Sequence, residues 1–89
     1  MKFIQRILSV FDKDIIMYSD AMWLDCQMAK SFFAQNGINI KVKDIVNEDV
    51  REEMKKRFNR VMTPVIIIKG KTFIGFDENK TEIKKNIGK

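Results

Sequence analysis

One cysteine is the most reactive side chain in this sequence, and it has no second thiol or imidazole to work with. Cys26 is the single cysteine among 89 residues, and the chain contains no histidine. A lone thiol cannot close an intramolecular disulfide or build a cysteine-rich zinc site. Without histidine there is no Ser-His-Asp or Cys-His triad and no histidine metal site. Thiol chemistry at Cys26 is therefore the main candidate, and no resident metal or bound cofactor is expected.

The segments around Cys26 predict a strand, a helix and a second strand. Residues 14–18 are typical of a short buried strand, in which Tyr18 is expected to be a core residue or to lie at the edge of a site. Apolar residues recur at helical spacing over residues 23–35, and Gly37 suits the left-handed position after a helix. Residues 38–43 alternate apolar and polar side chains, which indicates a half-buried strand. The two strands of such a βαβ unit should be parallel.

A second helix is predicted after Asn47, whose side chain can cap its first turn. Its buried stripe would consist of Val50, Met54 and Phe58. On its outer face, Glu52 is spaced to pair with Lys56 and Glu53 with Arg57, at i,i+4. This helix should therefore have one apolar and one charged side.

The remainder of the chain predicts a hairpin followed by a last helix. Residues 65–68 follow the only proline and are β-branched, so they indicate a strand, and residues 69–71 suit a tight turn into a return strand over 72–74. Residues 79–87 predict a helix, in which Asn79 and Glu82 have capping-box spacing. The predicted order from residue 13 onward is β-α-β-α-β-β-α.

Residues 2–11 predict an additional amphipathic helix. Their apolar side chains fall at helical spacing, with polar side chains opposite. The apolar face could pack on its own domain, form a homodimer contact or lie on a membrane surface. The expected organisation is one domain over residues 1–89, with a helical extension over 1–12 and a core over 13–88.

The charge pattern favours no nucleic-acid or membrane partner. Seventeen basic and twelve acidic residues give a net charge of +5, and the two signs are interleaved along the chain. Recognition of nucleic acid would favour a basic stripe with interleaved aromatic residues, which is absent here. No apolar run reaches the roughly 20 residues of a membrane span, and the N-terminus lacks signal-peptide features. We therefore expect a cytoplasmic protein, in which a lone cysteine stays reduced.

Three short motifs make the chain resemble the glutaredoxin family of the thioredoxin superfamily. They are Cys26-Gln27-Met28-Ala29-Lys30 at the first long helix, Thr63-Pro64-Val65 before a strand, and Gly75-Phe76-Asp77 before the last helix. Their order and spacing resemble most the short bacterial glutaredoxin-like redoxins. The resemblance implies a thioredoxin fold, an α/β fold with a four-stranded mixed sheet flanked by helices. It implies a cis peptide bond before Pro64.

The resemblance also exposes a departure at the redox motif. In glutaredoxins the motif is C-x-x-C, and its first cysteine attacks the substrate disulfide. Cys26 aligns with the second, resolving cysteine, so Trp23 stands where the nucleophile belongs. An indole cannot attack sulfur, so the two-thiol cycle cannot run from this sequence as written.

Several interpretations of Trp23 and Cys26 remain open. Trp23 could be a natural replacement in a non-catalytic relative, an introduced change, or a selenocysteine codon translated as tryptophan. Cys26 could be a buried small hydrophobe or a slow single thiol that forms intermolecular disulfides. The native residue at position 23 would separate the interpretations of Trp23.

The resemblance further implies a binding groove and an activity. Thr63, beside Pro64, would pair with the backbone of glutathione or of a cysteine-containing peptide. Backbone N–H groups of Gly75, Phe76 and Asp77 could receive a carboxylate. The implied function is thiol–disulfide oxidoreduction, with electrons passed to disulfides, impaired here at Trp23, and with glutathione as co-substrate or a protein disulfide as partner. The alternative is a non-catalytic binding module, dimeric through residues 2–11.

Overall fold

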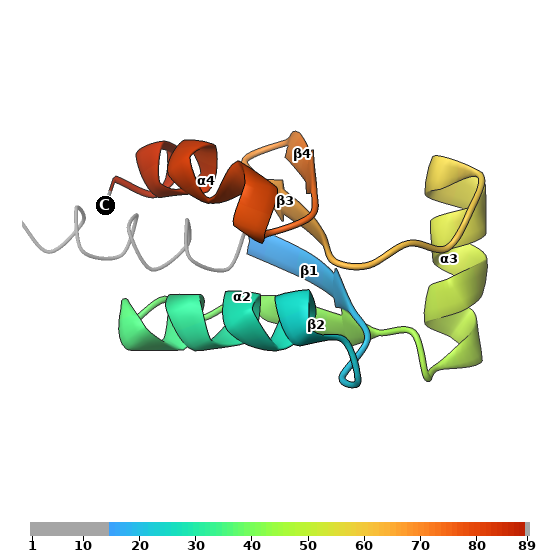
Figure 1. Cartoon of the computed structure of the whole chain (residues 1–89). Coiled ribbons are helices and arrows are strands. Elements are labelled where there is room, and N and C mark those ends of the chain that lie inside the picture. Colours follow the sequence, from blue (N-terminus) through green and yellow to red (C-terminus); the bar gives the residue numbers. More distant parts are fainter. Residues whose placement is uncertain (1–14, 89) are drawn as a thin grey trace, which may run out of the picture.

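The protein forms the predicted succession of strands and helices. The computed structural model describes residues 15–88 (Figure 1). The predicted helix over residues 2–11 and the extension over 1–12 lie outside the described residues. The elements are β1 (Ile15–Ser19), α2 (Leu24–Gln35), β2 (Lys41–Asp44), α3 (Glu48–Phe58), β3 (Val65–Ile68), β4 (Lys71–Ile74), the 3₁₀ turn η1 (Asp77–Asn79) and α4 (Lys80–Asn86).

The four strands form one mixed sheet in the order β2-β1-β3-β4. β1 and β2 run parallel, as expected for a βαβ unit, while β1 pairs with β3 and β3 with β4 in antiparallel fashion. The hairpin between β3 and β4 turns at Lys69 and Gly70, both of which have positive φ. This is the four-stranded mixed sheet of the thioredoxin fold that the resemblance implied.

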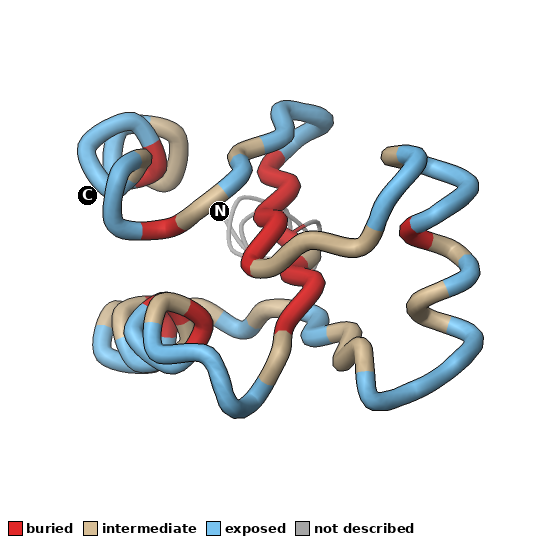
Figure 2. Tube along the Cα trace, turned by 45° about the vertical axis from the view of Figure 1, so that its right-hand side comes forward, coloured by how far each residue is buried: buried red, intermediate tan, exposed pale blue. Residues whose placement is uncertain are grey.

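Helices cover both faces of the sheet, giving three layers. α2 and α4 lie on one side and α3 stands on the other (Figures 1 and 2). Alternate residues of β1 supply the two cores because successive side chains of a strand point to opposite faces. Met17 packs in the core beneath α2 and α4, and its neighbour Tyr18 packs in the core beneath α3.

Local signals placed most helix boundaries correctly. The Asn47 side chain accepts a hydrogen bond from the Asp49 N–H at 2.8 Å, so it caps α3 as predicted. Gly37 has φ +68° after the end of α2, also as predicted. The capping box at Asn79 and Glu82 is wrong: the Asn79 side-chain amide donates to the carbonyl oxygens of Ile74 and Gly75 instead, at 2.8 and 2.9 Å. This contact ties the last helix back to the end of β4.

The second strand is shorter than predicted. β2 begins at Lys41, whereas the alternating pattern began at Ile38. The Ile38 N–H donates to the Phe33 carbonyl oxygen at 2.9 Å, so it satisfies the end of α2 rather than a strand partner. Ile38 and Ile40 still pack against the core on the α2 side. These two residues are therefore apolar because they contact the core, although they precede the strand.

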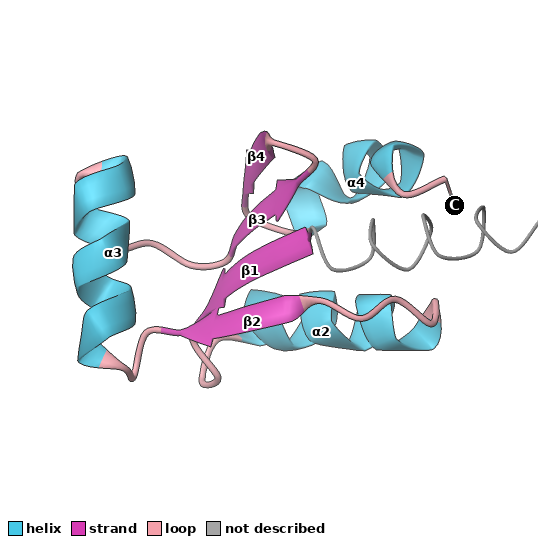
Figure 3. Ribbon diagram, turned by 180° about the vertical axis from the view of Figure 1, so that it is seen from behind, coloured by secondary structure: helices cyan, strands magenta, loops and turns pink. Residues whose placement is uncertain are grey.

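Seen from behind, β1 and β2 lie side by side and lead toward α3, while α2 and α4 extend the other way (Figure 3). Within residues 15–88 no helix is both long enough and apolar enough to span a bilayer.

Candidate functional site

Trp23 marks the beginning of α2 and points outward. Its backbone is extended, its N–H donates to the Asp20 carbonyl oxygen at 3.0 Å, and its carbonyl oxygen accepts from the Gln27 N–H at 3.1 Å. The indole makes no capping hydrogen bond, and the residue is 58% exposed. A twelve-residue helix thus begins directly after position 23, and the side chain at that position is accessible. Such a position lowers the pKa of a cysteine placed there, because the helix N-terminus favours negative charge.

Cys26 lies about one turn further into α2 and is fully buried. Its Sγ accepts a hydrogen bond from the Asp20 N–H at 3.4 Å. The loop between β1 and α2 therefore closes over the thiol. This burial favours the interpretation of Cys26 as a buried small hydrophobe, and it means that a substrate sulfur cannot reach the thiol without local opening.

Asp25 makes a contact that the sequence did not reveal. Its carboxylate accepts hydrogen bonds from the backbone N–H groups of Phe76 and Asp77, at 2.7 and 3.0 Å. These are N–H groups to which the resemblance assigned the carboxylate of a ligand. The partners lie 51 and 52 residues apart in the chain, so no local spacing could have identified Asp25.

The proline loop and the segment after β4 are joined directly. The Thr63–Pro64 peptide bond is cis, Pro64 is buried, and its carbonyl oxygen accepts from the Gly75 N–H at 2.9 Å. Gly75 has φ +92°, and a Cβ at this position would collide with the Glu78 side chain. Glycine is favoured here because other residues are strained at this φ, whereas the Glu78 carboxylate can move aside.

A chain of hydrogen bonds links the predicted site residues to one another. Asp25 joins the start of α2 to Phe76 and Asp77, and Gly75 joins that segment to Pro64. Thr63, next to Pro64, is only partly buried. The motifs quoted for the resemblance therefore form one continuous region of the fold.

An apolar pocket of about 580 Å³ opens at the start of α2. We call it the α2-start pocket; its lining is formed by Met22, Trp23, Leu24, Asp25, Met28 and Asp77. Met22 and Leu24 are 88% and 68% exposed, so this region is unusually apolar for a solvent-facing surface. Thr63, Pro64 and Cys26 do not line it. The structure therefore places Trp23 and Asp77 in one pocket, with Cys26 inside the protein behind them.

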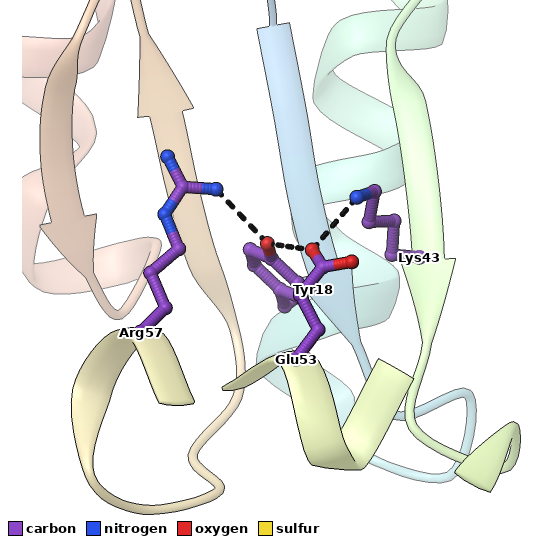
Figure 4. Close-up of polar contacts among 4 residues, drawn as sticks. All are labelled: Tyr18, Lys43, Glu53 and Arg57. Atoms are coloured by element: carbon purple, nitrogen blue, oxygen red, sulfur yellow. Dashed lines mark hydrogen bonds and ion pairs between the residues drawn. The ribbon is translucent and has the colours of Figure 1, made fainter. Parts of the chain in front are cut away.

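A polar network stands on the opposite face of the sheet (Figure 4). Tyr18 is fully buried, which confirms its core position, and its hydroxyl donates to the Glu53 carboxylate. Arg57 donates to the Tyr18 hydroxyl at 3.1 Å, and Lys43 donates to Glu53 at 2.7 Å. The network joins β1, β2 and α3, so it anchors α3 to the sheet.

The two predicted i,i+4 ion pairs along α3 do not form. This network and an i,i+3 pair take their place. Glu53 bonds to Lys43 on β2 rather than to Arg57, and Glu52 bonds to Lys55 at 3.3 Å rather than to Lys56. The difference arises because α3 turns Glu53 and Arg57 toward the sheet, where Tyr18 offers a buried hydroxyl. Helical spacing alone could not show which face the sheet would cover.

The network shifts two ionisation equilibria in opposite directions. Burial, and then the hydrogen bond to Glu53, raise the pKa of Tyr18 above its ordinary value of 10.0. The hydrogen bond from Lys43, and then the one from Tyr18, lower the pKa of Glu53 below its ordinary value of 4.5. Glu53 is therefore a carboxylate and Tyr18 a neutral phenol near neutral pH. We assign this network to stability, because it lies on the other side of the sheet from Trp23.

The site has the framework for thiol exchange but no exposed thiol. Position 23 is exposed at a helix start, yet it carries an indole, and the thiol of Cys26 is buried. Within residues 15–88, no three Cys, Asp or Glu side chains gather closely enough to hold a metal ion. The chemistry available to the described residues is thus binding at the surface, with Cys26 accessible only after local opening.

Known structures share this fold. A glutaredoxin from Archaeoglobus fulgidus is 21% identical, with a TM-score of 0.67 over 84% of this chain and 86% of that one. A glutaredoxin from Brucella melitensis is 27% identical, with a TM-score of 0.56 over 86% and 92%. A buckwheat glutaredoxin–glutathione complex is 14% identical, with a TM-score of 0.65 over 97% and 84%. Comparison with curated proteins gave no match.

A family comparison matches most of the described fold. The glutaredoxin family model covers residues 15–74, from the first residue of β1 to the last residue of β4. This range includes Trp23, Cys26, Thr63 and Pro64, and it stops just before Gly75. The family match agrees with the strand order of the sheet and with the contacts that join the three motifs. This chain belongs to the glutaredoxin family.

Proposed function

We propose that this chain is a glutaredoxin-type thiol–disulfide oxidoreductase whose two-thiol cycle is interrupted at position 23. The family and the fold support an oxidoreductase-like function. The observation that carries the proposal is the pairing of an exposed Trp23 at the start of α2 with a fully buried Cys26 three residues later. The scaffold of the reaction is present, and its attacking sulfur is missing.

The missing step can be written out from the geometry. In the complete cycle, a thiolate at position 23 attacks a substrate disulfide, forms a mixed disulfide and expels one substrate thiolate. The second thiol, at position 26, then attacks the mixed disulfide and releases the other substrate thiol. Two electrons pass to the substrate, and a disulfide remains in the protein. Trp23 cannot begin this sequence, so Cys26 has nothing to resolve.

The proposed ligands are glutathione, as co-substrate, or a protein disulfide. The buckwheat relative in complex with glutathione supports this ligand class. The Phe76 and Asp77 N–H groups would donate to a carboxylate of such a ligand only after Asp25 had released them. The partly buried Thr63 would pair with the ligand backbone. We place this activity in the cytoplasm, where Cys26 would remain reduced.

The second candidate function is a non-catalytic binding module. The exposed Trp23 within an apolar pocket favours it, because an indole gives a large contact area where the nucleophile would otherwise be. A dimer contact through residues 2–11 belongs to this alternative and lies outside the described residues. The two candidates differ in whether a thiol restored at position 23 produces turnover.

The decisive experiment compares Trp23→Cys with the unchanged protein in glutathione-dependent disulfide reduction. Leu24→Cys is the matched control, because Leu24 is equally close to the start of α2 and 68% exposed but is not at the motif position. We expect turnover in Trp23→Cys alone. Adding Cys26→Ser to Trp23→Cys should remove the two-thiol reaction and leave glutathione-dependent exchange.

Three results would contradict the proposal. Turnover by the unchanged protein would show that position 23 is not where the cycle is interrupted. Equal turnover in Leu24→Cys would show that any exposed thiol suffices. Inactivity of all the cysteine variants, with folding intact, would favour the binding module. Reading codon 23 in the gene separately distinguishes a native tryptophan from a selenocysteine position.

A further inference from the structure

The α2-start pocket combines exposed apolar side chains with acidic groups only. Met22, Trp23 and Leu24 are all more than half exposed, although such side chains are usually covered. The ionisable residues in its lining are Asp25 and Asp77, and neither is basic. This local composition contrasts with the chain as a whole, which carries a net charge of +5.

Asp25 also occupies the backbone N–H groups that would otherwise bind an anionic ligand beside the α2-start pocket. The Phe76 and Asp77 N–H groups both donate to its carboxylate, at 2.7 and 3.0 Å. A ligand carboxylate would have to displace Asp25 and would then lie beside two protein carboxylates. Hydrogen bonds to charged groups are among the strongest in proteins, so this displacement is costly. Glutathione, which carries two carboxylates, is therefore disfavoured.

A basic and apolar polypeptide meets none of these obstacles. Its apolar side chains would cover Met22, Leu24 and Met28, and so remove apolar surface from water. A Lys or Arg would lie near the exposed Asp77 carboxylate and could stack on the Trp23 ring. Asp25 could remain bonded to the backbone N–H groups throughout. The pocket is complementary to such a segment in both charge and polarity.

We propose that the α2-start pocket binds an apolar polypeptide segment that carries a Lys or Arg, in preference to glutathione. The proposal rests on the proposed function, since it chooses between the two ligand classes named there. It concerns binding alone and requires no thiol at position 23. Asp25 is then a specificity-determining residue, and Asp77 supplies the exposed charge that the basic residue meets.

The single tryptophan of the chain provides the readout, because it is part of the pocket. The unchanged protein is titrated with a short peptide of Leu, Phe and Lys, with the same peptide carrying Glu in place of Lys, and with reduced glutathione. Trp23 fluorescence is recorded at about 0.15 M salt, where charges more than about 8 Å apart are largely screened. Under these conditions the net charge of +5 contributes little, and nearby carboxylates decide the preference.

We expect the Lys peptide to bind at least about 10-fold more tightly than the Glu peptide or glutathione, since apolar contact and charge both favour it. Asp77→Asn should weaken the Lys peptide about 2- to 5-fold, as for the loss of one exposed ion pair. Glu78→Gln removes the same charge one residue later, outside the pocket lining, and should have little effect. Asp25→Ala should strengthen glutathione binding several-fold, because it frees two N–H donors.

The outcomes separate this inference from the proposed function. Equal binding of the Lys and Glu peptides, tighter binding of glutathione, or no binding of any ligand would overturn the inference. So would equal effects of Asp77→Asn and Glu78→Gln, or an unchanged glutathione affinity in a folded Asp25→Ala protein. The peptide-binding results do not bear on whether Trp23→Cys restores turnover, which tests the proposed function by itself.

Discussion

Glu53→Gln tests whether the network beneath α3 stabilises the fold as the structure indicates. Glu53 accepts hydrogen bonds from the buried Tyr18 hydroxyl and, at 2.7 Å, from the Lys43 ammonium. Glutamine preserves the shape and one accepting oxygen but removes the charge. Tyr18 would keep its hydrogen bond from Arg57. The substitution therefore weakens two interactions without leaving a cavity.

The expected loss follows from these contacts and from the exposure of Glu53. A hydrogen bond to a charged group contributes about 1.5–3 kcal/mol when it is well protected. The Glu53 side chain is 38% exposed, and solvent screening reduces that value. We expect the free energy of unfolding to fall by about 1–2 kcal/mol. In a domain of this size, that corresponds to a decrease in Tm of roughly 4–16 °C.

The loss should also depend on pH, and the direction of the pKa shift gives its sign. Because the pKa of Glu53 is lowered by folding, its contribution is fully present above the ordinary value of 4.5. The contribution disappears as the pH falls through the lower pKa of the folded state. Glutamine does not titrate, so the stability difference between the two proteins should narrow in acid.

Urea denaturation followed by circular dichroism, near neutral pH and in acid, measures both effects. Glu52→Gln is the matched control, because Glu52 precedes Glu53 on α3 and forms only an exposed pair with Lys55. We expect it to cost no more than about 0.5 kcal/mol. Equal losses in the two variants, or a Glu53→Gln difference that stays constant in acid, would refute the assigned role of the network.

Three further predictions concern the candidate site. Asp25→Ala should lower the free energy of unfolding by about 1–3 kcal/mol, because two backbone N–H groups lose a carboxylate acceptor; a loss below about 0.5 kcal/mol in urea denaturation would contradict this. Gly75→Ala and Gly37→Ala should each cost about 1–3 kcal/mol, since both have positive φ and the Glu78 carboxylate near Gly75 can move aside; a loss below about 0.5 kcal/mol at both positions would contradict this. Cys26 should react with a thiol reagent at least about 100-fold more slowly in the folded protein than in urea, because it is fully buried and opens only locally; rapid labelling without denaturant would show that the thiol is accessible.

Local sequence signals were sufficient for most of the fold because they act over a few residues. The Asn47 cap, the Gly37 helix end and the β-branched run after Pro64 each follow from backbone preferences that do not depend on distant residues. The capping box at Asn79 failed because a side-chain amide found two carbonyl oxygens near the end of β4. The prediction that the second strand begins at Ile38 was wrong, because the Ile38 N–H donates to the Phe33 carbonyl oxygen at the end of α2.

The sequence by itself determined that one thiol lies near the start of a helix, with a tryptophan three residues before it, and that three short motifs occur in the order found in glutaredoxins. Only the tertiary structure decided that Cys26 is inaccessible and that Asp25 occupies the Phe76 and Asp77 N–H groups. Residue spacing specifies which side chains share a face of one element. Which faces meet depends on packing between elements far apart in the chain, and that packing places an acidic, apolar pocket at Trp23 in a protein of net charge +5.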